Sequence, residues 1–294
     1  MYDQRVILTI YILTDTNRKG MDVHGDMSLD YADLARDAAT AGGTVAADLF
    51  RTDLAVETKG GKTDHVTRAD RETQQRVVSV IQESDPDCTI VGEENDARKD
   101  VPDAGVAWVI DPIDGTNNYV RGMRYWATSV AVVENGEPIA AASVLPAVGD
   151  TYVAGDETSR NGDRVTVSTR TDPETFTVAP TVWWDFDRRD EYAAATEGGV
   201  SRFGDLVRLK SVQVALALVA AGSIEGAVTN VKPNPWDSIA GAHLVEQAGG
   251  TVTDIEGKDW DHDSQGLVAS NGHAHEAMLA AAREAERLRE RKGT

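Results

Sequence analysis

The stretch WVIDPIDGTNN, residues 108–118, decides the fold and points to the chemistry. Three apolar residues end at Asp111, as a buried strand ends at a sheet edge, and the proline that follows cannot donate to a strand ladder. We therefore expect Asp111 and Asp114 to lie close together on a rigid bend. Gly115 lets a ligand approach the backbone, and Thr116 begins a short helical pattern whose N–H groups suit a phosphate.

Carboxylates for a hard cation beside N–H groups for an anion indicate a metallophosphatase site. The alternative is an Asx-rich surface turn in which Asp114 only caps a helix. Glu93 also follows an apolar run, and Asp237 lies in the first turn of a predicted helix, where capping alone would explain it. If Glu93, Asp111, Asp114 and Asp237 meet, their mutual repulsion requires a cation, and magnesium prefers such oxygen ligands.

Apolar periodicity around this stretch predicts helices and strands along most of the chain. Helices are expected at residues 30–50, 70–85, 190–197, 212–221, 236–248 and 273–289, and strands at 88–92, 106–110, 127–133, 139–145, 150–154, 175–182, 224–229, 251–253 and 267–269. The pattern predicts an α+β metal-binding half over residues 27–155 and an α/β half over residues 156–294, with a cleft between them. Residues 1–26 do not fit it and are expected to form a disordered extension.

Composition limits the partners of the protein. The 294 residues carry 49 acidic and 29 basic side chains, a formal net charge of -20, which argues against binding nucleic acid or anionic membranes. The apolar runs fall far short of the ~20 residues that span a bilayer, and no signal cleavage site follows the first of them. The single cysteine, Cys88, suits a reducing compartment. We expect a cytoplasmic protein whose acidic surface is adapted to salt, as in halophiles.

Three motifs together resemble the inositol monophosphatase family. They are GEE at residues 92–94, DPIDGT at 111–116 and WDSIAG at 236–241, flanked by KGGKTDHVTRAD at 59–70 and LVEQAGGTV at 244–252. The family contains lithium-sensitive, magnesium-dependent sugar phosphatases related to fructose-1,6-bisphosphatase, and the resemblance covers residues 29–279. It implies an α+β fold, the layered α/β/α/β/α sandwich of the sugar phosphatases, and a homodimer.

The resemblance also implies the ligands of the metal ions. Glu93, Asp111 and the Ile113 carbonyl would bind one magnesium ion, and Asp111, Asp114 and Asp237 would bind a second. A weak third ion would lie near Glu93 and residue 70, beside the loop at residues 59–62.

The resemblance further implies that the N–H groups of Gly115 and Thr116 would hold the phosphate. Glu93 and the hydrogen-bonded pair of Thr116 and Asp70 would deprotonate the metal-bound water that attacks in line. The implied catalytic residues are therefore Glu93, Thr116 and Asp70.

The pocket for the leaving group departs from the family pattern. Inositol-preferring members carry a Gly-Ser/Thr-Ala turn where this chain has Lys210 and the two residues after it, and a glutamate where it has Asn230. We expect Arg208, Lys210 and Lys232 to receive a second phosphate, as in fructose 1,6-bisphosphate, with ordinary surface charge as the alternative. Both lysines are expected to favour the bisphosphate over inositol 1-phosphate.

Other functions remain open at this stage. The same chemistry would serve a nucleotide 3′-phosphate, NADP or histidinol phosphate. A different class is a non-catalytic regulator with the same fold that binds a protein partner, as some bacterial relatives do.

Overall fold

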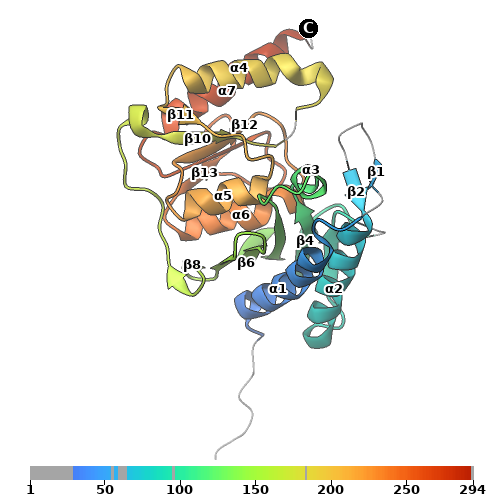
Figure 1. Ribbon diagram of the computed structural model, residues 1–294. Coiled ribbons are helices and arrows are strands. Elements are labelled where there is room, and N and C mark those ends of the chain that lie inside the picture. The colour runs from blue at the N-terminus through green and yellow to red at the C-terminus, as the bar shows by residue number, and fades with distance from the viewer. Residues whose placement is uncertain (1–28, 54–55, 59–64, 95–96, 183, 293–294) are drawn as a thin grey trace, which may run out of the picture.

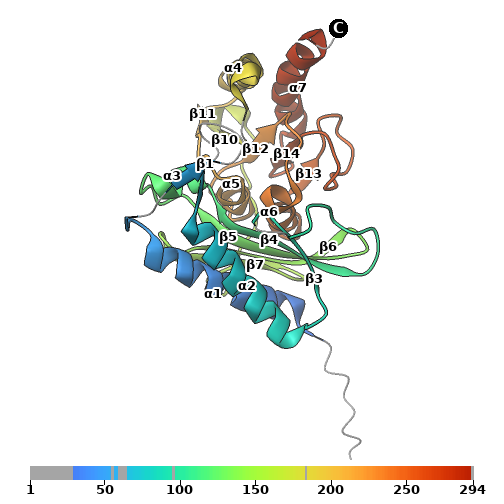
Figure 2. The ribbon, with the colours of Figure 1, turned by 90° about the vertical axis from the view of Figure 1, so that its right-hand side faces the viewer.

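The computed structural model describes residues 29–53, 56–58, 65–94, 97–182 and 184–292. The extension expected at residues 1–26 and the loop at residues 59–62 lie outside these ranges. Five layers stack in the order helices, sheet, helices, sheet, helices (Figures 1 and 2). This confirms the α/β/α/β/α sandwich expected from the sequence.

Six of the seven α-helices in the described residues supply the three helical layers. Helices α1 (Tyr31–Leu49) and α2 (Arg68–Ser84) cover the outer face of the first sheet, α5 (Val212–Ala220) and α6 (Pro235–Gln247) lie between the sheets, and α4 (Arg189–Val200) and α7 (His275–Lys292) cover the second sheet (Figure 2). The seventh, α3 (Thr116–Val120), is a single short turn beside the first sheet.

The first sheet has the order β3-β4-β5-β6-β7-β8-β9. Its strands are β3 (Thr89–Gly92), β4 (Val106–Asp114), β5 (Ala127–Glu134), β6 (Glu137–Leu145), β7 (Asp150–Ala154), β8 (Thr158–Arg160) and β9 (Asp163–Arg164). Only the β3–β4 pair is parallel. The sheet runs past residue 155, the expected boundary between the halves, because β8 pairs with β7 and β9 with β8.

The second sheet has the order β11-β10-β12-β14-β13. Its strands are β10 (Thr177–Pro180), β11 (Asp205–Leu206), β12 (Gly226–Thr229), β13 (Thr251–Thr253) and β14 (Leu267–Ser270). Strand β10 is parallel to β11 and β12, whereas β14 is antiparallel to both of its neighbours. The half expected to be α/β therefore has a mixed sheet. A separate hairpin pairs β1 (Val56–Thr58) with β2 (His65–Thr67).

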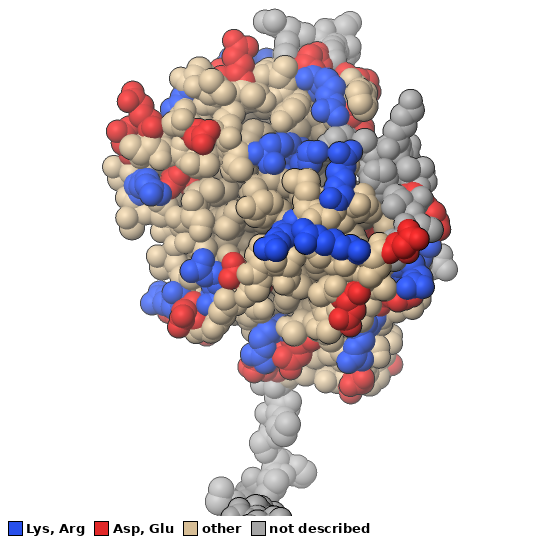
Figure 3. All heavy atoms as spheres, viewed as in Figure 1, with Lys and Arg blue, Asp and Glu red and all other residues tan. Residues whose placement is uncertain are grey.

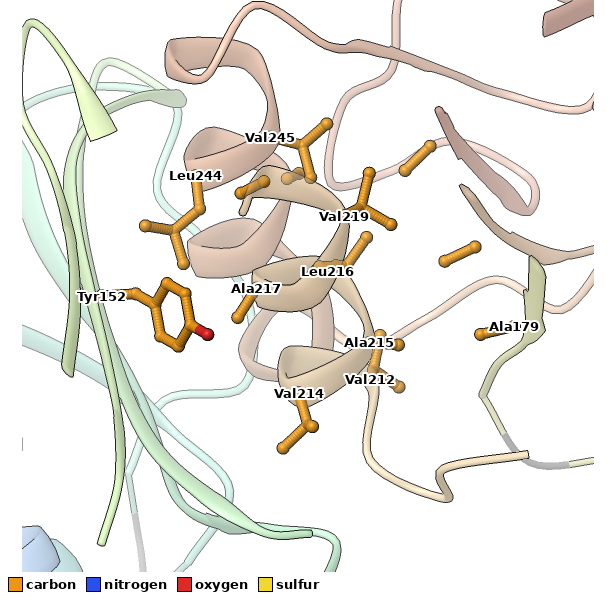
Figure 4. Close-up of a cluster of buried hydrophobic side chains, with 14 of the residues drawn as sticks. Tyr152, Ala179, Val212, Val214, Ala215, Leu216, Ala217, Val219, Leu244 and Val245 are labelled. Carbon is orange, nitrogen blue, oxygen red and sulfur yellow. The ribbon is translucent and has the colours of Figure 1, made fainter. Parts of the chain in front are cut away.

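The largest hydrophobic cluster fills the space between the two sheets. Helix α5 is apolar on every side apart from Gln213 in its first turn, as suits a helix buried between two sheets, and its Leu216, Ala217 and Val219 pack with Leu244 and Val245 of α6 (Figure 4). This central layer carries the N-termini of α5 and α6 toward the end of β4. No helix among the described residues is long and apolar enough to cross a membrane.

The end of β4 differs from the sequence-based prediction. We expected the strand to stop at Ile110, but it continues to Asp114, and its pairing with β5 shifts register between Asp111 and Asp114. A bulge explains this, because the residue that cannot donate, Pro112, lies within the irregular part of the ladder. The proline carbonyl still accepts a hydrogen bond from Thr128 Oγ1 at 2.8 Å.

Candidate metal centre

Three of the predicted carboxylates meet where β4 reaches the first turn of α6. Asp111, Asp114 and Asp237 each offer one oxygen, and these oxygens all lie within 4.8 Å of one another. Asp111 and Asp114 come from the bulge of β4 and are 1% and 6% exposed, while Asp237 is partly buried. Asp237 also accepts hydrogen bonds from the main chain and side chain of Asn234, so it caps α6 and joins the cluster at once.

The electrostatics of this cluster favour a cation. Burial, and then the charges of Glu93, Asp114 and Asp237, raise the pKa of Asp111 well above its usual range. Burial also raises the pKa of Asp114 to about 7, even though the hydrogen bond from Ser211 lowers it. Asp111 Oδ1 is buried without a hydrogen-bond partner in the described part of the chain. The cluster therefore has more carboxylate oxygens than hydrogen-bond donors to satisfy them. Such oxygens are the ligands that a hard divalent ion such as magnesium prefers.

Glu93 lies just past the end of β3, as expected, and is partly buried. Among the neighbouring charges, that of Glu93 contributes most to the raised pKa of Asp111. Lys99 Nζ donates to the carbonyls of Gly92 and Glu93 at 2.7 and 2.8 Å, so the turn that carries Glu93 is tied down. Glu93 does not belong to the group of three mutually close carboxylates.

Thr116 and Asp70 form the expected pair, with Thr116 Oγ1 donating toward Asp70 Oδ1 at 3.3 Å. The same hydroxyl lies 3.0 Å from the Ile113 carbonyl. Asp70 is fully buried in the first turn of α2, where its Oδ2 accepts hydrogen bonds from the main-chain nitrogen and the hydroxyl of Thr67. A capping box thus fixes the carboxylate that faces Thr116.

Gly115 is required by its surroundings. Its φ is +87°, and a Cβ there would lie 3.0 Å from Ser211 Cβ and 3.1 Å from the Tyr125 carbonyl. The turn that begins α3 is therefore pressed against the start of α5. Lys210 adjoins it and has φ +58°, a left-handed conformation that glycine adopts more easily.

Asn230 is held by partners from the second half of the chain. It is fully buried, its Oδ1 accepts from Trp184 Nε1 at 2.7 Å, and its Nδ2 donates to Glu191 and Glu286 at 2.6 and 3.2 Å. These partners occupy both ends of the amide. Asn230 is therefore not offered to a ligand in this structure, and we leave it out of the proposed substrate site.

The three predicted cations have different surroundings. Arg208 donates to the carbonyls of Pro180 and Val182 at 2.8 and 2.6 Å and stacks on aromatic rings, which gives it a structural role. Lys232 is exposed and pairs with Asp263 at 2.8 Å. Lys210 is partly buried next to Gly115, and no ion pair joins it to another described residue.

Sequence reasoning missed the residues that hold Asp114. Ser211 Oγ, Val212 N and Gln213 N all donate to its carboxylate. The available signal was Ser211 itself, because a serine before an apolar run marks a helix N-cap. Its hydrogen bond to Asp114, which lies 97 residues earlier in the chain, could not be predicted from the sequence pattern.

The sandwich and its acidic cluster define a class of phosphatase that is generally metal-dependent. The model of the inositol monophosphatase family matches residues 29–287, and the chain belongs to that family. A curated fructose-1,6-bisphosphatase/inositol-1-monophosphatase of Thermotoga maritima is 35% identical over 226 residues, 76% of this chain and 84% of the relative. The Nus factor SuhB of Escherichia coli K12 is 32% identical over 254 residues, 84% and 93% of the two chains. A solved Thermotoga maritima IMPase superposes with a TM-score of 0.80 at 32% identity, over 88% and 99% of the two chains.

Proposed function

We propose that this protein is a magnesium-dependent phosphomonoesterase that hydrolyses small sugar or cyclitol phosphates, foremost inositol 1-phosphate and fructose 1,6-bisphosphate. The observation that carries the proposal is the meeting of Asp111, Asp114 and Asp237, two of them with raised pKa values, beside the Thr116–Asp70 pair. The Thermotoga maritima relative, which bears both activities in its name, supports the two substrates.

The proposed metal ligands are the residues implied by the motifs. Asp111, Asp114 and Asp237 would hold one magnesium ion, and Glu93, Asp111 and the Ile113 carbonyl a second, with a weaker third near Glu93 and Asp70. When bound, the ions supply Lewis-acid activation of the phosphate ester and of the attacking water.

The protein's own groups bind and orient the reactants. Thr116 Oγ1 donates toward Asp70, so its lone pairs can accept a hydrogen bond from a water and hold that water for attack; a proton taken from the water would pass through the hydroxyl to the Asp70 carboxylate. Hydrogen bonds from Thr67 hold the Asp70 carboxylate in place, and this carboxylate in turn orients the Thr116 hydroxyl. Gly115 and Thr116 would offer their N–H groups to the phosphate.

For the leaving group we propose a role for Lys210 alone among the three predicted cations. Arg208 and Lys232 are engaged by carbonyls and by Asp263, whereas Lys210, whose main-chain carbonyl lies against Gly115, belongs to the turn beside the proposed phosphate site. Several Lys and Arg side chains also lie near the centre of the face in Figure 3, the face on which α3 and α5 lie in Figure 1. In a chain of net charge -20, such a gathering favours an anionic substrate.

A phosphate-release panel tests the proposal. Inositol 1-phosphate, fructose 1,6-bisphosphate, a nucleoside 3′-phosphate, NADP and histidinol phosphate are compared with magnesium or with chelator, in dilute and in molar KCl. We expect magnesium-dependent release from the first two. Lys210→Ala should lower kcat/KM for the bisphosphate about tenfold relative to inositol 1-phosphate, with Lys232→Ala as the matched control. Release from none of the five substrates would contradict the proposal.

We further propose a cytoplasmic, salt-adapted homodimer. The acidic composition supports adaptation to salt, and light scattering in molar KCl tests the dimer. A regulatory role is the second candidate, because a relative of 32% identity is named a Nus factor. A folded protein that binds no magnesium and releases no phosphate would favour it.

A further inference from the structure

The start of α5 binds the carboxylate of Asp114 and the main-chain carbonyl that directly precedes Asp237. Asp114 accepts from Ser211 Oγ, from Val212 N at 3.2 Å and from Gln213 N at 2.7 Å. Ser211 Oγ also accepts from Val214 N at 3.2 Å, so one hydroxyl both caps the helix and binds the carboxylate. Ser211 and Gln213 are 2% and 0% exposed, which keeps water from competing for these bonds.

The side chain of Gln213 contacts the residue that precedes Asp237. Its Nε2 donates to the carbonyl of Trp236 at 2.7 Å, and Trp236 directly precedes Asp237. Gly241 of α6 lies against the same glutamine, since a Cβ there would be 2.9 Å from Gln213 Oε1. The glutamine is thus wedged between α5 and α6 and has little room to shift.

These contacts add polar bonds between two layers that also pack through apolar side chains. Asp114 belongs to the first sheet and Asp237 to the central helical layer, and two carboxylates so close together repel each other when no cation lies between them. The start of α5 donates to Asp114 and to the Trp236 carbonyl from residues 211–213, and Gln213 makes bonds of both kinds. The distance between the two carboxylates is thereby tied to the geometry of a single helical turn.

We propose that Ser211 and Gln213 are positioning residues that clamp Asp114 and Asp237 at the spacing a shared cation requires. The inference rests on the proposed function, since it assumes that this cluster binds magnesium. Groups that orient metal ligands in this way typically change metal affinity by about 10- to 100-fold when removed.

Magnesium titration into the metal-free protein, followed by calorimetry, tests the clamp without relying on catalysis. Ser211→Ala and Gln213→Leu should each weaken magnesium binding about tenfold, and Ser211→Thr, which keeps the hydroxyl, should restore it. The matched control is Ser270→Ala on β14, a fully buried serine that bonds to His275 and lies in the other sheet. Its loss should leave the affinity unchanged. If Ser211→Ala fails to fold, Gln213→Leu carries the test, because its main-chain bond to Asp114 remains.

A double-mutant comparison separates positioning from general stability. In an Asp237→Asn background, Asp114 is the only charged ligand that the clamp positions. Ser211→Ala should therefore weaken magnesium binding by less than a further threefold in that background. Equal effects in both backgrounds, wild-type affinity in Ser211→Ala and Gln213→Leu, or an equal loss in Ser270→Ala would each overturn the clamp. If the wild type itself binds no magnesium, the proposed function falls with it, whereas wild-type binding with unaffected variants removes the clamp alone.

Discussion

The carboxylate cluster at β4 and the network around Asn230 are both buried polar groups, but their charges are balanced differently. At the cluster, acceptors outnumber donors, Asp111 Oδ1 has no partner in the described chain, and the pKa of Asp111 is raised. Around Asn230, burial raises the pKa of Glu191, but hydrogen bonds from Arg188 and Asn230 outweigh it and the net pKa is lowered. This difference supports the proposal that the unbalanced region is a ligand site, and we interpret the balanced one as a structural joint.

The largest expected effect comes from removing charge at the unbalanced region. Asp111→Asn should abolish magnesium-dependent phosphate release at any practical magnesium concentration, because the proposed bridging charge is lost. Asp237→Asn should mostly raise the magnesium requirement. Steady-state kinetics over a magnesium series checks both, with the exposed Asp100→Asn as control. More than a tenth of the wild-type kcat in Asp111→Asn would refute the assignment.

Adding charge to the balanced region should destabilise the fold. Asn230→Glu, the residue of inositol-preferring relatives, would bury a third carboxylate against Glu191 and Glu286 and remove the donor they share. We expect a loss of about 3 kcal/mol in unfolding free energy, as for other uncompensated buried charges. Denaturant unfolding measures it. Unchanged stability with improved inositol 1-phosphate turnover would instead place position 230 in the substrate pocket.

A change of pH should affect the stability contributions of the two regions differently. Asp114 has a folded-state pKa of about 7 against an ordinary value of 3.8, so the metal-free folded state binds more protons than the unfolded state between those values. This group's contribution to stability therefore falls as pH rises from about 4 to 7. Glu191, with a lowered pKa, contributes a constant amount in that window.

The measurement is the melting temperature of the metal-free protein at pH 5.5 and 8. We expect a lower value at pH 8 that magnesium raises, and a smaller difference in Asp111→Asn, which has one fewer of the coupled carboxylates. A melting temperature that rises between the two pH values without magnesium would contradict the sign.

The smallest effect per residue concerns the surface outside both regions. Exposed acidic side chains repel one another in a chain of net charge -20, and salt screens them with a Debye length of about 10 Å at 0.1 M. The melting temperature should rise between dilute buffer and molar KCl. A flat response would remove the salt adaptation and leave the metal centre untouched.

The sequence predicted the cluster well because its residues follow local rules. Asp111 comes after an apolar run, and Asp237 follows the Asn-Pro signal of a helix start, so both positions could be assigned to an element end. Glu93 was assigned by the same rule, but it lies outside the group of three mutually close carboxylates. The bulge at the end of β4 was missed because β4 pairs across it with β5, a strand later in the chain.

The network around Asn230 could not be predicted from local sequence rules. Asn230 finds Glu191 and Glu286 at separations of 39 and 56 residues, and Arg208 donates to carbonyls 26 and 28 residues away. Whether a polar residue faces a ligand or an internal partner depends on such tertiary contacts, which spacing alone does not encode. The clamp on Asp114 was missed for the same reason.

Direct binding of magnesium tests the account most directly. Metal-free wild type and Asp111→Asn are titrated with magnesium by calorimetry at pH 7.5, with folding of both confirmed by circular dichroism. The account predicts saturable binding to the wild type and none to the variant over the same range. Equal binding by both proteins, or none by either, would contradict it.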